Sequence, residues 1–430
     1  MRPLSKSHFV KTVLSWALWG AISAGVTVAA DWPTYRGDNA RSGSAAESVR
    51  VPLQPRWIAS APGVPRISFS SAEGRVVEGY LLGHRAKYDD AIHPVVVGQQ
   101  VFFGSSVDHQ LHCVDLHTGA ESWTFYSGGP IRLAPTVADN RVYFGSDDGF
   151  VYCLAAADGR LLWKQRGGPA DEWLLARGEM VSRWPIRTGV LVDGGVAYFG
   201  AGIFPHDDVF LTAVNAADGS IVWKQGNISS LDAGRNDLSP QGYLLASDNL
   251  LVVPSGRSLP AVFDRATGRL LHKREFGRGT AGGVVGSVQA LLADGQIYSA
   301  GPHHLLAMEQ KTGDVGYGWI AGRQMSVSGD AAYVATGEVV ARLDRMEYAV
   351  NSRRRHQLEL DITSFNNQLR AATAVPEKAV EVRKKISEAQ AELKRITDVG
   401  IVWQTKTTDD SALLAAGGTA ANFSSAEAKL

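Results

Sequence analysis

The stretch His117-Thr-Gly-Ala-Glu-Ser-Trp123 decides the fold of this 430-residue chain, because the chain repeats it. In each copy an Asp or Thr precedes a Gly, and an aromatic or His residue follows that Gly by four positions. The further copies are Ala157-Asp-Gly-Arg-Leu-Leu-Trp163, Ala217-Asp-Gly-Ser-Ile-Val-Trp223, the weaker Ala266–His272 and Lys311–Tyr317, and the end of a sixth at Ile401-Val-Trp403. Self-similarity at a fixed period indicates an array of like modules stacked on one another.

Each module reads as four short strands. In one copy, β-rich runs separated by Asn, Asp and Gly turn residues are Ala134–Asp139, Val142–Ser146, Phe150–Leu154 and Arg160–Gln165. Four antiparallel strands in a repeat of roughly 40 residues describe a propeller blade, and blades must stack because one alone cannot bury both faces. The sequence therefore predicts an all-β propeller of six to seven recognisable blades. Large rings should be buried between them at Trp123, Trp163, Trp223 and Trp403.

The repeated phrase resembles the repeat of the PQQ-like (quinoprotein-type) β-propeller family, and the resemblance covers residues 90–430. The opening Asp31-Trp-Pro-Thr-Tyr-Arg-Gly-Asp-Asn-Ala-Arg-Ser-Gly43 is similar to the start of secreted bacterial members. The family includes dehydrogenases that use pyrroloquinoline quinone (PQQ) with Ca²⁺. It also includes members without a cofactor, among them scaffold lipoproteins of outer-membrane protein assembly. The resemblance therefore implies the fold and leaves the activity open.

Composition and the N-terminus indicate an exported globular protein. Lys plus Arg equals Asp plus Glu at 43 each, which gives no charge bias toward nucleic acid or acidic membranes. Basic residues precede an apolar stretch, Thr12–Ala30, that ends in Val28-Ala-Ala30. This pattern predicts a signal peptide over residues 1–30, with cleavage after Ala30 and a periplasmic or secreted mature protein. The alternative is an uncleaved membrane anchor.

The two cysteines, Cys113 and Cys153, raise the question of a disulfide. Aligning Gly119 with Gly159 places both cysteines at the same point of the third strand in adjacent blades. Such positions fan outward and should exceed the roughly 7 Å Cα separation that a bridge allows. We therefore expect two free, buried thiols. The dehydrogenases that the chain resembles carry a vicinal cysteine pair over the cofactor, and the chain has no such pair.

Two insertions interrupt the period. The first, Arg166–Trp184, is expected to be a long inter-blade loop. The second lies within the sixth repeat, where apolar residues step by three and four on both sides of Pro376. It is predicted to form an antiparallel helical hairpin over residues 346–398 with a coiled-coil-like seam. The hairpin either buries only its own seam or serves as a docking arm for a protein partner.

Four residues are candidates for a ligand site on the face that carries the inter-blade connections. Arg132 and Arg187 each precede a conspicuous Tyr by 11 positions, just before an innermost strand, where side chains reach the channel mouth. Convergent arginines suit a carboxylate, a phosphate or an anionic quinone. His206 and Arg257 are expected on the same face. Each of these residues also has a structural alternative, because Asp, His and Arg in loops commonly hold turns. No metal site and no hydrolase or phosphate-loop motif is predicted.

The chain termini indicate a shared last blade. Asp410–Gly418 resembles a first strand, Thr419–Ser425 a second, and Pro52–Trp57 an isolated fourth strand. Such a blade lacks its third strand, which suggests a version truncated from a longer propeller of eight blades. Two function classes remain open. One is a non-catalytic extracytoplasmic scaffold that binds a ligand or protein, which the missing cysteine pair favours. The other is a PQQ-dependent oxidoreductase.

Overall fold

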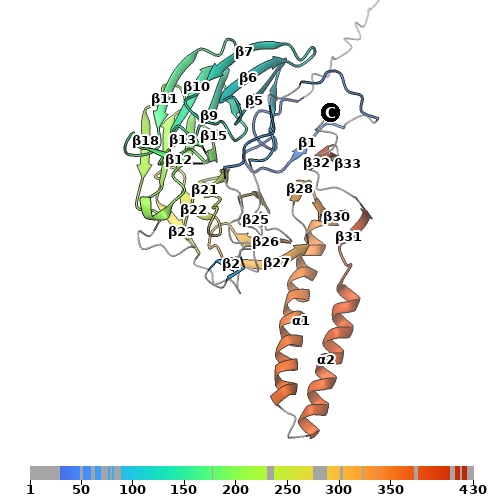
Figure 1. Cartoon of the computed structure of the whole chain (residues 1–430). Helices are drawn as coiled ribbons and strands as arrows, with labels where there is room; N and C mark the ends of the chain where they lie inside the picture. Colours follow the sequence, from blue (N-terminus) through green and yellow to red (C-terminus); the bar gives the residue numbers. More distant parts are fainter. Residues whose placement is uncertain are drawn as a thin grey trace, which may run out of the picture.

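Six four-stranded antiparallel sheets follow one another along the chain in the computed structural model (Figure 1). The structure describes residues 30–48, 52–59, 63–68, 76–77, 80–81, 89–176, 178–229, 237–274, 288–300, 304–321, 324–336, 338–371, 376–406, 412–416 and 419–423. The proposed signal peptide lies outside these residues, apart from Ala30. No described helix is long and apolar enough to cross a membrane.

Each sheet is one blade, and its strands are hydrogen-bonded in the order of the sequence. The first blade contains β4 (Val95–Val97), β5 (Gln100–Gly104), β6 (Gln110–Asp115) and β7 (Glu121–Tyr126). The second contains β8 (Thr136–Ala138), β9 (Arg141–Gly145), β10 (Phe150–Ala155) and β11 (Leu161–Arg166). The third contains β15 (Leu191–Asp193), β16 (Val196–Ala201), β17 (Phe210–Asn215) and β18 (Ile221–Gln225). The four strands expected from residues 134–165 are therefore confirmed.

The next three blades follow the same plan. The fourth contains β20 (Leu245–Ser247), β21 (Leu250–Val253), β22 (Ala261–Asp264) and β23 (Leu270–His272). The fifth contains β24 (Ala290–Ala293), β25 (Gln296–Ala300), β26 (His304–Glu309) and β27 (Val315–Ala321). The sixth contains β28 (Gln324–Ser328), β29 (Ala331–Ala335), β30 (Val339–Asp344) and β31 (Ile401–Lys406). An all-β propeller is thus the fold that the repeats predicted.

A seventh, smaller sheet joins the two ends of the described chain. Its strands are β1 (Ser44–Ala45), β32 (Ala412–Ala416) and β33 (Thr419–Phe423), in that order. The first-strand and second-strand predictions for this blade match β32 and β33. Pro52–Trp57 does not form a strand, so that prediction is wrong in form, although Trp57 takes the role of a fourth-strand ring as described below.

The repeated phrase interlocks neighbouring blades. In five places an aromatic or His ring packs on the turn Gly of the next blade, so close that a Cβ there would lie 2.5–2.8 Å from a ring atom. The pairs are Trp57–Gly119, Trp123–Gly159, Trp163–Gly219, Trp223–Gly268 and His272–Gly313. In each pair the ring nitrogen lies 2.8–3.1 Å from the carbonyl oxygen three residues before that Gly. Glycine is required because the turn has a positive φ, +69 to +76°, and because the ring occupies the space of a side chain.

Trp403 departs from this rule. Trp163 and Trp223 are each 9% exposed, whereas Trp403 is 39% exposed. The expectation that Trp403 is buried is therefore wrong. The reason is that its place in the pattern requires a third-to-fourth-strand turn in the seventh blade, and the described residues contain no such turn.

The segment Asp31–Ala45, here called the central segment, touches the first strands of all seven sheets. Trp32 exchanges two backbone hydrogen bonds with Val96 of β4. Further backbone N–H groups donate to its carbonyls at 2.8–3.0 Å from Val137, Ala246, Leu292 and Val327, in blades two, four, five and six. Asn39 donates its side-chain amide to Val192 of β15, and β1 pairs in parallel with β32. Because first strands are the innermost strands of blades, a segment that reaches all of them occupies the centre of the ring.

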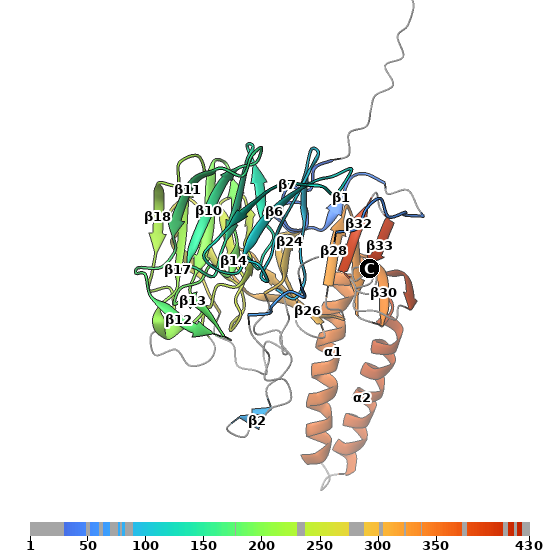
Figure 2. The same cartoon turned by 45° about the horizontal axis from the view of Figure 1, so that its top comes forward.

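The second insertion forms two antiparallel helices, α1 (Arg345–Ala371) and α2 (Pro376–Ile396), between β30 and β31. They lie side by side and project away from the sheets (Figures 1 and 2). Their shared seam buries Leu358, Ala389 and Ile396. The base is fixed because Arg355 donates to the carbonyls of Ile396 and Thr397. The inserted helical hairpin of the sequence prediction is confirmed.

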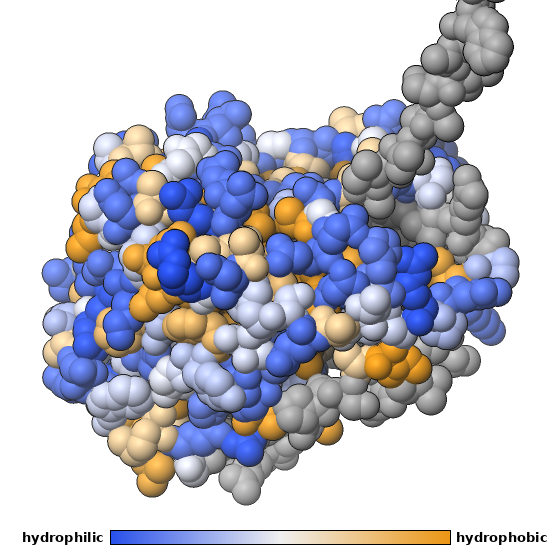
Figure 3. Space-filling model, turned by 90° about the horizontal axis from the view of Figure 1, so that it is seen from above, coloured by the Kyte–Doolittle hydropathy of each residue, from blue (hydrophilic) through white to orange (hydrophobic). Residues whose placement is uncertain are grey.

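Short strand pairs complete the structure. The first insertion, expected to be a loop, contains a two-stranded hairpin of β12 (Trp173–Ala176) and β13 (Glu179–Ser182). A parallel pair, β14 (Thr188–Gly189) with β19 (Gly242–Tyr243), links the third and fourth blades. The remaining pair is β2 (Val76–Val77) with β3 (Tyr80–Leu81). Seen from the side opposite the helices, apolar residues are scattered among hydrophilic ones (Figure 3).

Candidate functional site

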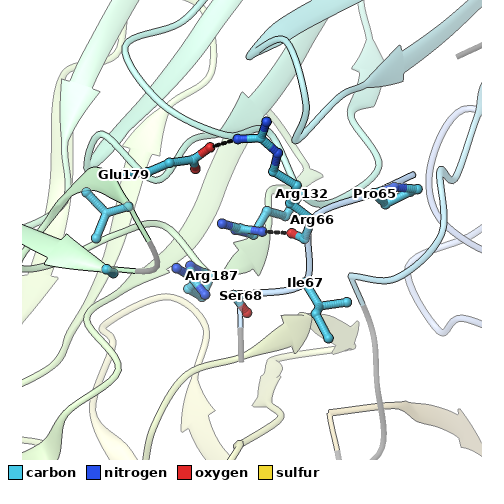
Figure 4. A pocket seen from close by; sticks show the side chains of 9 residues that line it. Pro65, Arg66, Ile67, Ser68, Arg132, Glu179 and Arg187 are labelled. Atoms are coloured by element: carbon cyan, nitrogen blue, oxygen red, sulfur yellow. Dashed lines mark hydrogen bonds and ion pairs between the residues drawn. The ribbon is translucent and has the colours of Figure 1, made fainter. Parts of the chain in front are cut away.

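A cavity of about 270 Å³ opens between the second and third blades, and it contains both arginines that the sequence singled out. Its lining residues are Pro65, Arg66, Ile67, Ser68, Arg132, Ala176, Glu179, Val181 and Arg187. Figure 4 shows the three arginines converging on one space, with Ile67 and Ser68 on the neighbouring segment. We call this cavity the arginine pocket.

Arg132 and Arg187 share one buried carboxylate. Asp147 lies in the turn between β9 and β10, and its side chain is 1% exposed. Arg132 Nε donates to Asp147 Oδ2 at 2.6 Å, while Arg187 Nε and Nη2 donate to its two oxygens at 2.6 and 3.0 Å. The sequence predicted that Arg132 and Arg187 line one channel mouth; both line the arginine pocket, and a ligand there stays a prediction. Their shared carboxylate also shows a structural task, since an Arg–Asp–Arg cluster tethers two inter-blade connections to one turn.

The third arginine reaches the pocket from a different segment. Arg66, with a side chain 56% exposed, pairs with Glu179 of β13 (Figure 4). The backbone carbonyl of Arg66 accepts a hydrogen bond from Arg132. Asp89 lies 3.8 Å from Arg132. Three arginines therefore face three carboxylates, so the pocket is a polar, charge-balanced space rather than a strongly cationic one.

The other two candidate residues lie elsewhere. His206 belongs to the short 3₁₀ turn η1 (Pro205–Asp207), its side chain is 64% exposed, and it lies 3.6 Å from Asp207. Arg257 stacks over the ring of Phe204, with its guanidinium carbon 5.6 Å from the ring centroid, and Phe204 also contacts His206. His206 and Arg257 thus form a second group around Phe204, and neither of them lines the arginine pocket.

Beside the arginine pocket stands a feature that the sequence reading missed. The hairpin β12–β13, which we call the flap, exposes the large apolar side chains Trp173 (40%), Leu174 (39%), Leu175 (75%) and Met180 (53%). Its inner residues Ala176, Glu179 and Val181 line the pocket. Arg183 anchors the flap to η1 through Asp207 at 2.5 Å. Two short runs, Trp173–Ala176 and Glu179–Ser182, lie on either side of Gly178. This arrangement of two runs around a turn glycine could have indicated a pair of strands.

Among the described residues, the central segment is tightly packed around Arg41 and Tyr35. Arg41 of that segment is fully buried and donates hydrogen bonds to Leu244, Thr34, Tyr35 and Asp38. Burial lowers the pKa of Arg41 to about 10. Tyr35 stacks on Tyr243 with ring centroids 3.6 Å apart. A cavity of about 20 Å³ lies beside Tyr35.

These observations bear on PQQ and Ca²⁺. The tricyclic quinone needs a flat site with polar contacts, whereas Tyr35 and Tyr243 stack on each other and the Arg41 guanidinium lies 5.9 Å from the centre of the Tyr243 ring. Cys113 and Cys153 are free, buried and in different blades, so they do not form a vicinal pair. No cluster of three or more His, Cys, Asp or Glu able to hold a metal occurs among the described residues. The central residues therefore do not fit the cofactor.

Comparison with known proteins identifies the family of the chain. A family model described as outer membrane protein assembly factor BamB, of the PQQ-like type, matches residues 68–200 and 205–354. The chain belongs to this PQQ-like, BamB-type family. Escherichia coli BamB is 31% identical over 106 residues, which are 25% of this chain and 24% of that protein. The match therefore spans about a quarter of the length of that relative. Tetrathionate hydrolase of Acidithiobacillus ferrooxidans is 23% identical over 222 residues, 49% of this chain and 40% of that protein.

Solved structures show more distant likenesses. BamB from Moraxella catarrhalis aligns with 57% of this chain and 70% of its own, at 17% identity and a TM-score of 0.44. A europium-containing methanol dehydrogenase aligns with 73% of this chain and 70% of its own, at 11% identity and a TM-score of 0.46.

Proposed function

We propose that this chain is an extracytoplasmic, non-catalytic scaffold of the PQQ-like family that binds a protein partner at the flap. The observation that carries this proposal is the exposed apolar surface of Trp173, Leu175 and Met180 beside the arginine pocket. Exposed aromatic and aliphatic anchors rimmed by Arg and Glu have the composition of interface centres. The family description, an outer membrane protein assembly factor, supports a role in assembling other proteins.

The arginine pocket gives the partner a second, polar contact. Arg66 is half exposed and its pairing with Glu179 is a surface pair, so a carboxylate on the partner can displace Glu179 at small cost. Arg132 and Arg187 remain held by Asp147 and shape the floor of the pocket. We expect the partner to present an apolar side chain to the flap and an acidic group to Arg66.

A location outside the cytoplasm completes this proposal. It rests on the predicted signal peptide of residues 1–30. Sequencing the N-terminus of the protein recovered from the periplasm or medium should give Asp31 as the first residue. A protein retained in the cytoplasm with its leader intact would contradict the localisation and leave the binding proposal standing.

Site-specific photocrosslinking in the native host tests the binding proposal. A photoreactive residue at Leu175 should capture one discrete partner, and the same residue at Ile221 should not. Ile221 is a matched control because it is an exposed aliphatic residue, at 52%, on the outer strand of the third blade. A Met180→Asp substitution should abolish the Leu175 crosslink. Equal crosslinking at both positions would show that the flap is not the binding surface.

The oxidoreductase alternative makes a different prediction. If the chain binds PQQ, adding PQQ and Ca²⁺ to the purified protein should shift the quinone absorption and permit dye reduction by an alcohol. The stack of Tyr35 on Tyr243 and the burial of Arg41 argue against this outcome. A stoichiometric spectral shift would favour the dehydrogenase role over the scaffold role.

A further inference from the structure

The arginine pocket combines charged and apolar walls in a space too small for a folded partner. Arginine side chains reach it from three segments, and Ser68 and Glu179 add further polar groups. The other walls are aliphatic side chains, those of Pro65, Ile67, Ala176 and Val181. The cavity of about 270 Å³ is slightly smaller than sites for drug-sized ligands, which have roughly 300–1,000 Å³. A space of this size accommodates one or two residues of a polypeptide.

The segment that carries Arg66 is fixed along its backbone. The Arg66 N–H donates to Ser106 Oγ at 2.8 Å, and the Arg66 carbonyl accepts a hydrogen bond from Arg132. Two residues further on, the Ser68 N–H donates to Asp89 Oδ2 at 2.7 Å. These three contacts hold the rim of the pocket, while the Arg66 side chain itself is 56% exposed. A ligand therefore meets a positioned arginine and does not have to order this segment first.

Among the three arginines, Arg66 is the one that a carboxylate reaches with the least rearrangement. The other two have side chains 5–6% exposed and already hold buried Asp147. Arg66 pairs with Glu179 near the surface (Figure 4), and Glu179 also lies 3.8 Å from His109 Nε2. A carboxylate that takes the place of Glu179 therefore leaves it beside an imidazole, which is a hydrogen-bond donor.

The end of a polypeptide chain matches this arrangement better than an internal acidic residue does. The α-carboxylate and the last side chain branch from one Cα, so both fit within one small cavity, the first on Arg66 and the second against the aliphatic walls. An internal Asp or Glu brings main chain on both sides, which a cavity of this size does not accommodate. Guanidinium groups bind carboxylates bidentately, and capture of a terminal carboxylate is a recurrent mode of peptide recognition.

The flap presents the pocket and its apolar surface on opposite faces. In its register Ala176 pairs with Glu179, and Leu175 pairs with Met180. Successive pairs of a two-stranded sheet point to opposite sides, which agrees with the first pair lining the pocket and the second pair being exposed. A chain end in the pocket, with the preceding residues on the outer face, would contact the flap from both sides.

We infer that the arginine pocket binds the C-terminal residue of the partner polypeptide, with its α-carboxylate on Arg66 in place of Glu179. The last side chain is aliphatic and lies against Ile67 and Val181. This assignment rests on the proposed function, because it names the part of the partner that enters beside the flap.

Fluorescence anisotropy with two labelled peptides and the full mature chain provides the test. Both peptides have the sequence Gly-Ser-Gly-Ala-Leu, and one ends in a free carboxylate while the other ends in an amide. The free acid should bind saturably, and the amide at least tenfold more weakly. Arg66→Gln should remove this preference, whereas Arg354→Gln should not. Arg354 is a matched control because it is a 47%-exposed arginine that pairs with Glu392 on the helical hairpin.

Glu179→Gln supplies a test with the opposite sign. It removes the carboxylate that competes for Arg66, so the free acid should bind several-fold more tightly. A substitution that merely disturbed the fold would weaken binding instead. Both Arg66→Gln and Glu179→Gln should keep the wild-type melting temperature, which is measured alongside, because their ion pair lies near the surface.

Three results would overturn the inference: no binding of either peptide at high micromolar concentration, equal binding of acid and amide, or a preference that Arg66→Gln leaves unchanged. The proposed function is judged separately, by the crosslink at Leu175. If that crosslink forms and also survives Arg66→Gln, the flap binds a partner whose C-terminus lies elsewhere, and only the inference fails.

Discussion

Replacing Gly159 with Ala should destabilise the propeller more than replacing Gly295, although both glycines have φ of +70°. At Gly159 an added Cβ would lie 2.5 Å from the Trp123 ring, whereas at Gly295 nothing lies within 4 Å. Both variants bear the cost of an L-residue in left-handed geometry, about 1–2 kcal/mol. Only the first must also displace an indole that is held by a hydrogen bond to Ala156.

The difference in the free energy of unfolding between the two variants measures the contribution of the contact between the ring and the glycine. Overpacking a fitted contact costs about 1–3 kcal/mol, and losing a hydrogen bond costs about 0.5–1.5 kcal/mol. One movement of the ring relieves the overpacking and breaks the hydrogen bond, so the two costs overlap. We therefore expect the free energies of unfolding of the two variants to differ by about 2 kcal/mol. Urea unfolding followed by circular dichroism, with both variants in parallel, gives the gap from the shift in midpoint at constant slope.

A Trp123→Ala background supplies the decisive control. Without the indole, the two glycine substitutions should lower the free energy of unfolding by the same amount, because only the cost of placing Ala in left-handed backbone geometry remains. If Gly159→Ala and Gly295→Ala are equally destabilising in the wild-type background, the repeated Gly serves only the turn. The ring-on-glycine account of blade stacking would then be wrong.

Three further predictions follow from buried groups. Arg187→Ala should lower the free energy of unfolding by about 3–5 kcal/mol because it removes one of the partners of buried Asp147. Arg183→Ala, which changes a 37%-exposed arginine, should shift the urea midpoint much less. Burial raises the pKa of Cys113 to about 11 and of Cys153 to about 12, so a thiol reagent at pH 8 should find no reactive group in native protein and two after denaturation. Burial, helped by the Arg36 charge, lowers the pKa of His93 to about 4. The unfolded state therefore takes up the proton first, so stability should fall as pH drops from about 6.5 toward 4, and His93→Gln should reduce that loss.

The fold was predictable because its determinants are local and repeated. Asp-Gly and Thr-Gly turns at a fixed distance from a Trp specify one hairpin and one inter-blade contact, and both recur several times along the chain. The helical hairpin was predictable for the same reason, since its apolar stripe lies within one continuous segment. Trp403 was misjudged because its burial depends on a neighbour from the other end of the ring. A pattern within one repeat carries no information about that neighbour.

The candidate site was predictable only in part. Arg132 and Arg187, at equivalent positions of two repeats, both pair with Asp147, whereas their predicted role in binding a ligand stays a prediction. Their shared partner Asp147 lies in a turn whose acidic residues are common in any strand connection, so nothing marked it as special. Because the Arg187 side chain is 5% exposed and paired to that carboxylate, Arg187→Ala should lower the melting temperature as well as change the pocket. Arg66 joins the pocket from a segment far away in sequence, which no spacing could reveal.

The central segment links the fold to the choice between functions. Its polar sequence resembles a family opening, yet its role comes from backbone groups, since five first-strand N–H groups donate to its carbonyls. Displacing it to admit a quinone would leave those donors and the guanidinium of Arg41 to find water or ligand partners in the channel. A cofactor would have to supply that many contacts before it gained any affinity. The flap, which we propose as the binding surface, exposes Trp173, Leu175 and Met180 and therefore suits a polypeptide better than a small planar cofactor.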